Sequence, residues 1–570
     1  MKRTKSYLLL SFIAFALVIT LSPVFGTGQK EAAKSRSSAT ASTAPVKVTM
    51  FAQFARDVVN PNTNWFTKYA EKRFNLNIHW TLVPPSGNIQ AKQALLLASG
   101  NYPDVFWDGQ FTPWNVLKYA QQQVIKPIDK NLVKEYAPNV WKAMQSNQAI
   151  RDISIGPDGQ MWGLPDNQNY CVHCYFGSEY WINTKLLQKY GQKMPTTTSQ
   201  FESVLEVFKQ HHLIPLSGTV AGPGGGWHGN VITFLMNSFV YNTDNQNATD
   251  FLDVSHGKVS FAATAAQWKQ GLAYMHQLYR KGLIDQEAFS QHLGGLEQEI
   301  AQGKVAVVAS GASNILLSGG SDNPNYKYWR TIPPLVGPNG VHYAAFYGNG
   351  DPMLGFVLTS KATRRQEVAL LKLINFLYTP LGTEMWDFGP KGKYWSSVKS
   401  GQLDAAGKQA LFNTNLTKFY SGNSLQNYGY DQTGPGYQSA VWRRGHTLGV
   451  APFSPGSDSA TNFYMSEKSM VGHQPTEVYP ASAWVPSSGA QQFALYNTNL
   501  YDYVMEWTTQ FITGTKSITN DWGRYVAGVR NIGLSSYLSI AQKAMKEPYN
   551  TSEFSHPDYS AIKYLTSLMK

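Results

Sequence analysis

The stretch Val46–Phe54 (VKVTMFAQF) is typical of a buried β-strand, and the residues that follow it decide the fold. After the turn-rich segment 60–64 (NPNTN), the aromatic residues of 65–74 recur at the spacing of one helix face. Ile78–Leu82 then alternates between apolar and polar residues, as a half-buried strand does. This strand, helix and strand order predicts a parallel α/β architecture.

The next segments continue the same order. Residues 88–99 (NIQAKQALLLAS) predict a second helix that Gly100 ends, and Pro103–Trp107 predicts a strand that returns to the core. In such sheets ligands bind beyond the carboxyl ends of the strands. Phe54–Asp57 and Trp107–Asp108 occupy that position.

Further along, the patterns predict a second set of elements. The expected strands are Tyr180–Asn183 and 304–309, and the expected helices are 185–190, 201–209 and 265–281. The helix over 201–209 is amphipathic, and the preceding Thr/Ser residues supply its N-cap. The chain therefore changes lobes shortly before Tyr180.

The N-terminus has the features of a cleaved secretion signal. Residues 1–26 begin with Lys2, Arg3 and Lys5 and contain an apolar run of about 15 residues, shorter than the roughly 20 needed to cross a bilayer. Residues 27–45 are small and polar, which is typical of a disordered linker. We expect the mature protein to work outside the cytoplasm.

Composition narrows the classes of function. Aromatic residues make up 13% of the chain and charged residues only 15%, a balance that suits stacking on sugar rings as well as ordinary core packing. The net charge of +12 is scattered along the chain, which argues against nucleic-acid binding. The excess of positive charge is compatible with a basic cleft for an acidic oligosaccharide. Solubility, or attraction to an anionic cell envelope, explains it equally well.

The cysteines lie close together in Cys171-Val-His-Cys174. This motif fits a disulfide, a redox motif or half a metal site, but no second pair of Cys or His at ligand spacing completes a zinc site. In an oxidising compartment a small-loop disulfide is favoured over two free thiols.

Six segments together resemble the extracellular solute-binding proteins of ABC importers, of the carbohydrate-binding (family 1) type. The segments are ASGNYPDVFW (98–107), YWINTKLLQKYGQKMPTTTSQFESV (180–204), EQEIAQGKVAVVASGASN (297–314), GFVLTSKATRRQEVALLKLINFLYT (355–379), FGPKGKYW (388–395) and NDWGRYVAGVRNIGLSSYLSIAQKAM (520–545). The last two resemble the subgroup of alginate-oligosaccharide-binding and LplA-like lipoproteins. The resemblance covers nearly the whole mature chain.

This resemblance implies a two-lobed periplasmic-binding-protein fold (type II-like) that closes on a ligand about a hinge. The expected parts are lobe 1 at 46–165 and 340–380, lobe 2 at 180–335 and 395–570, and crossovers at 166–179, 336–339 and 381–394. It also implies a monomer that docks on the transmembrane subunits of an ABC permease.

The chain departs from this family in two places. Several relatives carry a calcium loop after the helix that corresponds to 201–209, whereas His211–Pro215 here offers no acidic cluster, so we expect no metal and no other cofactor. The lipidation cysteine is missing near the expected cleavage site. We therefore expect a periplasmic or cell-surface protein without a lipid anchor.

The candidate ligand-binding residues are aromatic, polar or basic side chains expected in loops. They are Arg56, Asp57, Trp107, Asp108, Trp227, His228, Tyr347, Asn349, Trp395, Tyr430, Trp442 and Arg443. Core packing for the aromatic residues, and solvated loop positions for the charges, are the alternatives. Arg443 would bind a uronate carboxylate in a bidentate fork if the ligand is acidic.

Enzymatic motifs do not stand out. The sequence has no GxSxG, HExxH or phosphate-loop motif, and no local pattern selects a pair of carboxylates for glycoside hydrolysis. The sequence thus predicts an oligosaccharide receptor for an ABC importer, with no catalysis. A secreted glycan-binding sensor component is the main alternative, ahead of a glycoside hydrolase.

Overall fold

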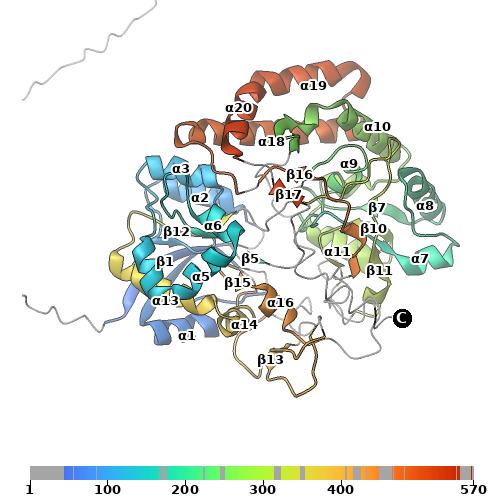
Figure 1. Ribbon diagram of the computed structural model, residues 1–570. Coiled ribbons are helices and arrows are strands. Elements are labelled where there is room, and N and C mark those ends of the chain that lie inside the picture. Colours follow the sequence, from blue (N-terminus) through green and yellow to red (C-terminus); the bar gives the residue numbers. More distant parts are fainter. Residues whose placement is uncertain are drawn as a thin grey trace, which may run out of the picture. The chain divides into compact units, whose positions relative to one another are not determined.

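Two β-sheets organise the described part of the chain in this computed structural model (Figure 1). The structure describes residues 44–570 except 55–56, 85–86, 166–167, 170–175, 222–224, 244–250, 314–316, 318–322, 347–352, 405–406, 415–424, 432, 448–464, 467, 481, 547–548, 552–566 and 568–570. The expected signal peptide and Cys171 and Cys174 lie outside these residues. Among the helices of the described part, none is long and apolar enough to cross a membrane.

The first sheet has the order β2-β1-β3-β12-β4. Its strands are β1 (Val46–Gln53), β2 (Leu76–Val83), β3 (Val105–Phe106), β4 (Leu164–Pro165) and β12 (Leu354–Leu358). As predicted, β1 runs parallel to β2 and β3, but β12 is antiparallel to both β3 and β4. The sheet is therefore mixed, because β12 arrives after the chain has passed through the second sheet and is not bound by a strand–helix–strand crossover.

Helices cover both faces of the first sheet (Figure 1). One layer comprises α1 (Trp65–Phe74), α4 (Lys130–Tyr136), α5 (Pro138–Ser146) and α13 (Arg364–Leu377). Their apolar sides pack on Val48, Met50 and Ala52 of β1. On the other face, α2 (Ile89–Ala98) and α3 (Pro113–Gln121) pack against Phe51 and Phe106.

The second sheet has the order β11-β6-β10-β7. Its strands are β6 (Tyr180–Asn183), β7 (Ile214–Ser217), β10 (Val305–Ala309) and β11 (Trp329–Thr331). β10 runs parallel to β7 and antiparallel to β6, so the carboxyl ends of β7 and β10 meet at one edge. Trp181 and Val308 face the cluster that includes α11 (Leu293–Ala301), whereas Tyr180 and Val307 face that of α8 (Thr198–Gln210).

The predicted elements of both sheets are confirmed to within a few residues. Asn88 is the N-cap of α2, and its side chain accepts a hydrogen bond from the backbone N–H of Ala91 at 2.8 Å. The remaining elements are α6 (Gln148–Ser154), β5 (Gln168–Asn169), α7 (Thr184–Lys189), α9 (Thr233–Met236), β8 (Leu252–Ser255), β9 (Lys258–Phe261), α10 (Ala266–Arg280), α14 (Pro380–Phe388), β13 (Trp395–Ser396), β14 (Asn413–Thr414), β15 (Tyr437–Gln438), α16 (Ala440–Arg444), β16 (Glu477–Val478), α18 (Ala490–Thr513), α19 (Ile518–Ile532), α20 (Leu534–Ala544) and β17 (Tyr549–Asn550), with short 3-10 turns at Ala262–Thr264, Gln286–Phe289, Tyr326–Tyr328 and Ser487–Gly489.

The long helix α18 contacts elements that belong to both sheets. It packs against α10 beside the second sheet and against α3 beside the first. The Phe493 ring of α18 meets Trp114 of α3 edge to face, with centroids 5.0 Å apart. Just before α18, Ser487 O accepts a hydrogen bond from Gln121 at 2.5 Å, and Trp484 Nε1 donates one to Asp152 O at 2.8 Å.

Candidate functional site

The carboxyl ends of β1 and β3 bring several predicted residues to one edge of the first sheet. The parallel register pairs Phe51 with Phe106, and the backbone N–H of Trp107 donates to Phe51 O at 2.9 Å. Asp108 is buried, and its carboxylate accepts from the Gln53 N–H at 3.2 Å. The parallel topology thus places Trp107 and Asp108 at the expected edge.

Trp107 fills the core at this edge. Its side chain is fully buried, with ring centroids 5.9 Å from Phe356 and 5.6 Å from Trp386. Gly434 lies so close that a Cβ there would be 2.5 Å from the Trp107 Nε1. That Nε1 has no hydrogen-bond partner among the described residues. In this structure Trp107 offers no exposed face to a ligand.

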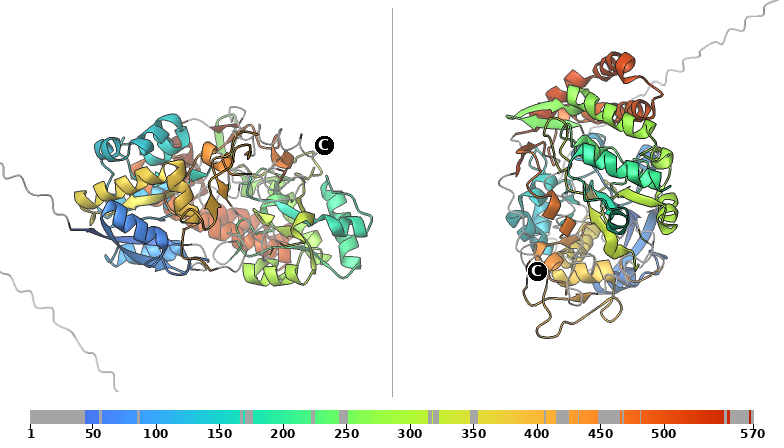
Figure 2. Two further views of the ribbon diagram at one scale, coloured as in Figure 1. Left: turned by 90° about the horizontal axis from the view of Figure 1, so that it is seen from below. Right: turned by 90° about the vertical axis from the view of Figure 1, so that its right-hand side faces the viewer.

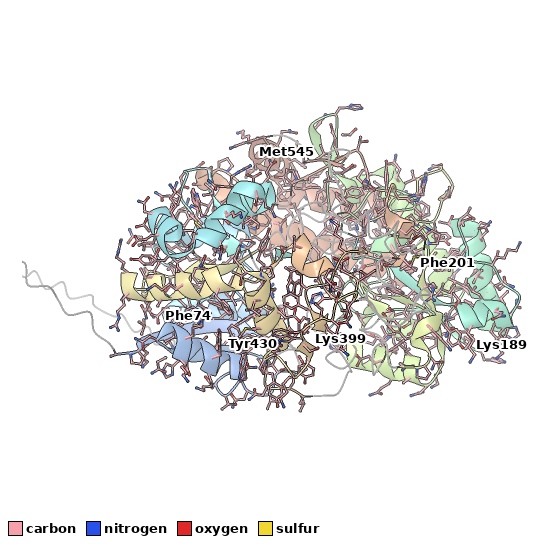
Figure 3. All side chains as sticks on the ribbon, turned by 60° about the horizontal axis from the view of Figure 1, so that its bottom comes forward. Phe74, Lys189, Phe201, Lys399, Tyr430 and Met545 are labelled. Carbon is pink, nitrogen blue, oxygen red and sulfur yellow. The ribbon has the colours of Figure 1, made fainter. Side chains whose placement is uncertain are left out.

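The segment around Tyr430 covers the same edge. The Asp57 carboxylate accepts from Gln426 Nε2 at 3.1 Å, and the Tyr430 ring stacks on Phe54 at 4.3 Å between centroids. Tyr430, labelled in Figure 3, lies beside α1, where its hydroxyl is hydrogen-bonded to Thr67. The sequence assigned 395–570 to the second lobe, yet these contacts attach Tyr430 to the first sheet.

Burial keeps the Tyr430 phenol protonated. Burial raises the pKa of this phenol, while the hydrogen bond from Thr67 opposes the shift. The hydroxyl also donates to Pro61 O at 3.0 Å. Tyr430 is therefore a neutral core residue that holds its segment on the first sheet.

Two buried carboxylates of α14 organise the remaining predicted residues of this region. Glu384 is fully buried and accepts from Thr414 Oγ1 at 2.6 Å and from Trp442 Nε1 at 3.1 Å. His446 Nε2 lies 3.0 Å from the same carboxylate. One acidic group thus anchors several points of the segment 414–446.

Asp387, one turn later on α14, anchors Gln438 and, through it, Arg443. It accepts from Gln438 Nε2 at 2.6 Å, and the side-chain Oε1 of Gln438 accepts in turn from the Arg443 guanidinium. That guanidinium lies 5.4 Å from the Trp442 ring centroid. Arg443 therefore has protein contacts on both its polar edge and its flat face.

Trp395 belongs to the same apolar cluster as Trp442. Its Nε1 donates to Gly389 O at 2.9 Å, and its ring meets Phe412 edge to face at 5.7 Å. Glu384 and Asp387 are not among the residues predicted from the sequence. Two acidic residues three positions apart on the apolar side of PLGTEMWDF (380–388) were the available signal.

The carboxyl edge of the second sheet carries Trp227 and His228. Trp227 is half-buried, its carbonyl accepts from the Gly311 N–H at 2.9 Å, and a Cβ on Gly311 would lie 2.4 Å from the indole Cε3. The buried His228 ring packs on Gly177 in the same way. His228 has a φ of 51°, a left-handed conformation that turns the loop.

Glu179, which is also not among the predicted residues, lies at this edge. Its backbone carbonyl accepts from Ser310 N at 3.1 Å, next to Gly311. Neither carboxyl oxygen has a hydrogen-bond partner among the described residues. Burial raises the pKa of Glu179 well above its ordinary value.

The structure thus gathers the predicted residues into separate groups. Asp57, Trp107, Asp108 and Tyr430 lie at the first sheet, Trp395, Trp442 and Arg443 beside α14, and Trp227 and His228 at the second sheet. Arg56, Tyr347 and Asn349 lie outside the described residues. Within the described residues, no group of three or more His, Cys, Asp or Glu side chains could hold a metal ion.

Comparison with known proteins adds a family and a fold. The family described as bacterial extracellular solute-binding protein matches residues 64–413. The fructooligosaccharide ABC transporter substrate-binding protein FusA of Streptococcus pneumoniae is 24% identical over 515 residues, which cover 85% of this chain and 87% of FusA.

Solved structures show the same architecture. FusA in complex with kestose aligns with a TM-score of 0.71 at 22% identity, over 87% of this chain and 98% of that chain. The alginate-binding protein AlgQ2 without calcium aligns with a TM-score of 0.68 at 18% identity, over 89% of this chain and 99% of that chain. These likenesses confirm the predicted α/β fold of solute-binding proteins.

Proposed function

Because this chain belongs to the family of bacterial extracellular solute-binding proteins, we propose that it captures an oligosaccharide and delivers it to an ABC permease. One observation carries the proposal: the similarity to FusA, named for fructooligosaccharide binding, extends over 85% of the chain. The protein acts as a monomer outside the cytoplasm, without a lipid anchor, and catalyses no reaction.

The mechanism we propose is closure of two lobes on the ligand. The loops at the carboxyl edges of the two sheets contact opposite sides of the oligosaccharide, and the ligand favours the closed form by its additional contacts there. Trp227 supplies the flat apolar face for a sugar ring, since its indole is only half-buried and is held against Gly311. Asp57, which is half-buried, is the proposed polar group of the first sheet, whereas the buried Asp108 holds the edge of the strand.

The contacts of Arg443 bear on the charge of the ligand. Arg443 already donates to Gln438 and lies on Trp442, which favours a neutral oligosaccharide over a uronate. A uronate would have to compete with Gln438 for the guanidinium. We therefore expect kestose to bind more tightly than an oligouronate of similar length.

Thermal unfolding in the presence of sugars tests the proposal. A ligand that binds only the native state raises the melting temperature as its concentration rises. At a free ligand concentration of a hundred times Kd, it adds about 2.7 kcal/mol to the free energy of unfolding. Kestose, longer fructans, milk oligosaccharides and oligouronates are compared, and the recovered sugar is analysed afterwards. Failure of every sugar to shift the melting temperature, or cleavage of the sugar by pure protein, contradicts the proposal.

A further inference from the structure

The helix layer of α1, α4, α5 and α13 carries an excess of positive charge. These helices lie side by side on one face of the first sheet (Figure 2, left). Their basic residues are Lys68, Lys72, Arg73, Lys130, Lys134, Lys142, Arg364, Arg365 and Lys372, and their acidic residues are Glu71, Glu135 and Glu367. We call this surface the basic helix layer.

The acidic residues of the layer do little to neutralise its outer surface. Glu367 is buried, where it pairs with Lys126 at 3.2 Å and accepts from the Asp129 N–H at 2.9 Å. Glu71 pairs with Lys68 at 2.8 Å and also accepts from the Ile78 N–H, so Glu135 is the one exposed acidic residue of these four helices. All the basic residues of the layer except the half-buried Lys130 are exposed. The outer surface is therefore strongly positive.

Aromatic rings lie directly beneath several of these cations. Lys134 Nζ is 4.6 Å from the Trp141 ring centroid, and Lys372 Nζ is 5.2 Å from that of Tyr136. Arg73 lies 5.5 Å from the ring of Phe376. Long cationic side chains over amphipathic aromatic rings are the composition found where proteins meet the head-group region of a bilayer.

A cavity of about 440 Å³ opens within the same layer, and Lys130, Lys134, Trp141 and Gln160 contribute to its wall. Lys130 Nζ donates to Gly159 O at 2.8 Å, which holds this ammonium group in place. Asp129 also lines the cavity, but its carboxylate accepts from the Asn131 N–H at 2.8 Å and faces Arg364 at 3.5 Å. Ammonium groups beside an indole suit a phosphate with an attached apolar or glycerol group.

The positive charge of this layer exceeds that of the helices on the other face of the first sheet and of α8. On the opposite face of the first sheet, Lys92 of α2 and Lys118 of α3 are the basic residues of their helices. On α8, beside the second sheet, Glu202 and Glu206 both pair with Lys281 at 2.7 Å. The basic helix layer is therefore more positive than these three helices.

We propose that the basic helix layer docks on an anionic lipid surface, with a lipid phosphate entering the cavity between Lys130 and Lys134. Docking would hold the receptor at the membrane and concentrate it near its permease. The surface is separate from the proposed sugar contacts at Trp227, so it acts whether or not a sugar is bound. The lipid is favoured over an acidic polysaccharide because the cations come with rings beneath them.

Co-sedimentation with phosphatidylcholine vesicles, with and without phosphatidylglycerol, tests this inference. The full-length mature protein should bind only the anionic vesicles, and more weakly as ionic strength rises. In the variant Lys134→Glu with Lys372→Glu, affinity should fall at least about 25-fold, since each surface cation is worth about fivefold. Its melting temperature should stay that of the wild type, because both side chains are exposed.

The matched control reverses two lysines that also lie over rings, away from the layer. Lys185 Nζ is 5.4 Å from Tyr328, and Lys189, labelled in Figure 3, is 4.9 Å from Tyr190. Lys185→Glu with Lys189→Glu should bind anionic vesicles like the wild type. Equal loss in both double variants, or no vesicle binding by the wild type, overturns the inference. Tighter binding to polygalacturonate than to anionic vesicles also overturns it, in favour of an acidic glycan.

Discussion

At the scale of single residues, Trp227 and Gly311 form the pair most directly tied to the proposed function. The indole can lie against the backbone of the β10 edge only because position 311 has no Cβ. The Gly311 N–H also donates to the Trp227 carbonyl, so the ring and its backbone are fixed together. A rigid, half-buried ring of this kind loses little entropy when a sugar stacks on it.

Replacing Trp227 by alanine should weaken oligosaccharide binding at least about tenfold, because a central aromatic contact of a binding site carries much of its energy. Isothermal titration with the best sugar from the thermal screen measures the loss. Trp522→Ala is the control, since Trp522 is a half-buried tryptophan of α19 packed on Tyr525. An unchanged Kd for Trp227→Ala removes this residue from the proposed site.

Glu179 predicts a pH dependence of stability. Its pKa is raised by burial above the ordinary value of 4.5, so the native state favours the protonated form. Below that ordinary value the carboxyl group is neutral in both states and carries no penalty. As pH rises toward the folded-state pKa, the unfolding free energy of the wild type should fall relative to that of Glu179→Gln.

Urea unfolding of both proteins between acidic and alkaline pH measures this slope. The comparison of slopes is insensitive to any constant cost of the glutamine amide. Glu135→Gln serves as the control, because Glu135 is exposed on α4. Parallel pH profiles for Glu179→Gln and the wild type would show that Glu179 ionises without cost.

At the scale of elements, α14 holds the segment 395–446 through buried carboxylates. Glu384 has hydrogen bonds to Thr414, Trp442 and His446, and its removal leaves their polar groups buried without an acceptor. Glu384→Ala should therefore destabilise the protein by about 3–5 kcal/mol. Glu206→Ala, which removes an exposed carboxylate paired with Lys281, should cost less than about 1 kcal/mol.

Limited proteolysis with mass spectrometry places the effect in the chain. Cleavage of Glu384→Ala should begin within 395–446, ahead of the two sheets. Simultaneous cleavage throughout the protein would mean that α14 supports the whole fold rather than this segment.

The elements also show what a sequence pattern can and cannot predict. The helix and strand periods of 46–107 located β1, α1, β2, α2 and β3 because each pattern reflects local burial on one face. The antiparallel entry of β12 depends on a partner about 250 residues away, which no local period encodes. For the same reason Trp107, Tyr430 and Trp442 looked like loop residues, although distant segments bury them completely.

At the scale of the whole molecule, residues 45–570 form one compact unit in which α18 contacts both sheets' helices. Phe493→Ala should remove the ring contacts with Trp114 and Tyr537 and cost about 3–5 kcal/mol. Calorimetry should show one unfolding transition for the wild type and two for the variant. Without the Phe493 contact, α18 no longer couples the unfolding of the two sheets. A single transition in both proteins would contradict this role of α18.

The late arrival of β12 also has a consequence for biogenesis. Strand β3 lies between β1 and β12 in the sheet, so the sheet stays open on one side until Leu354–Leu358 has been synthesised. A nascent chain thus emerges from the ribosome with an unfinished core for more than half of its translation, because β12 has not yet been made. That delay suits a precursor bound for export, since a translocation channel accepts an unfolded thread more readily than a folded body.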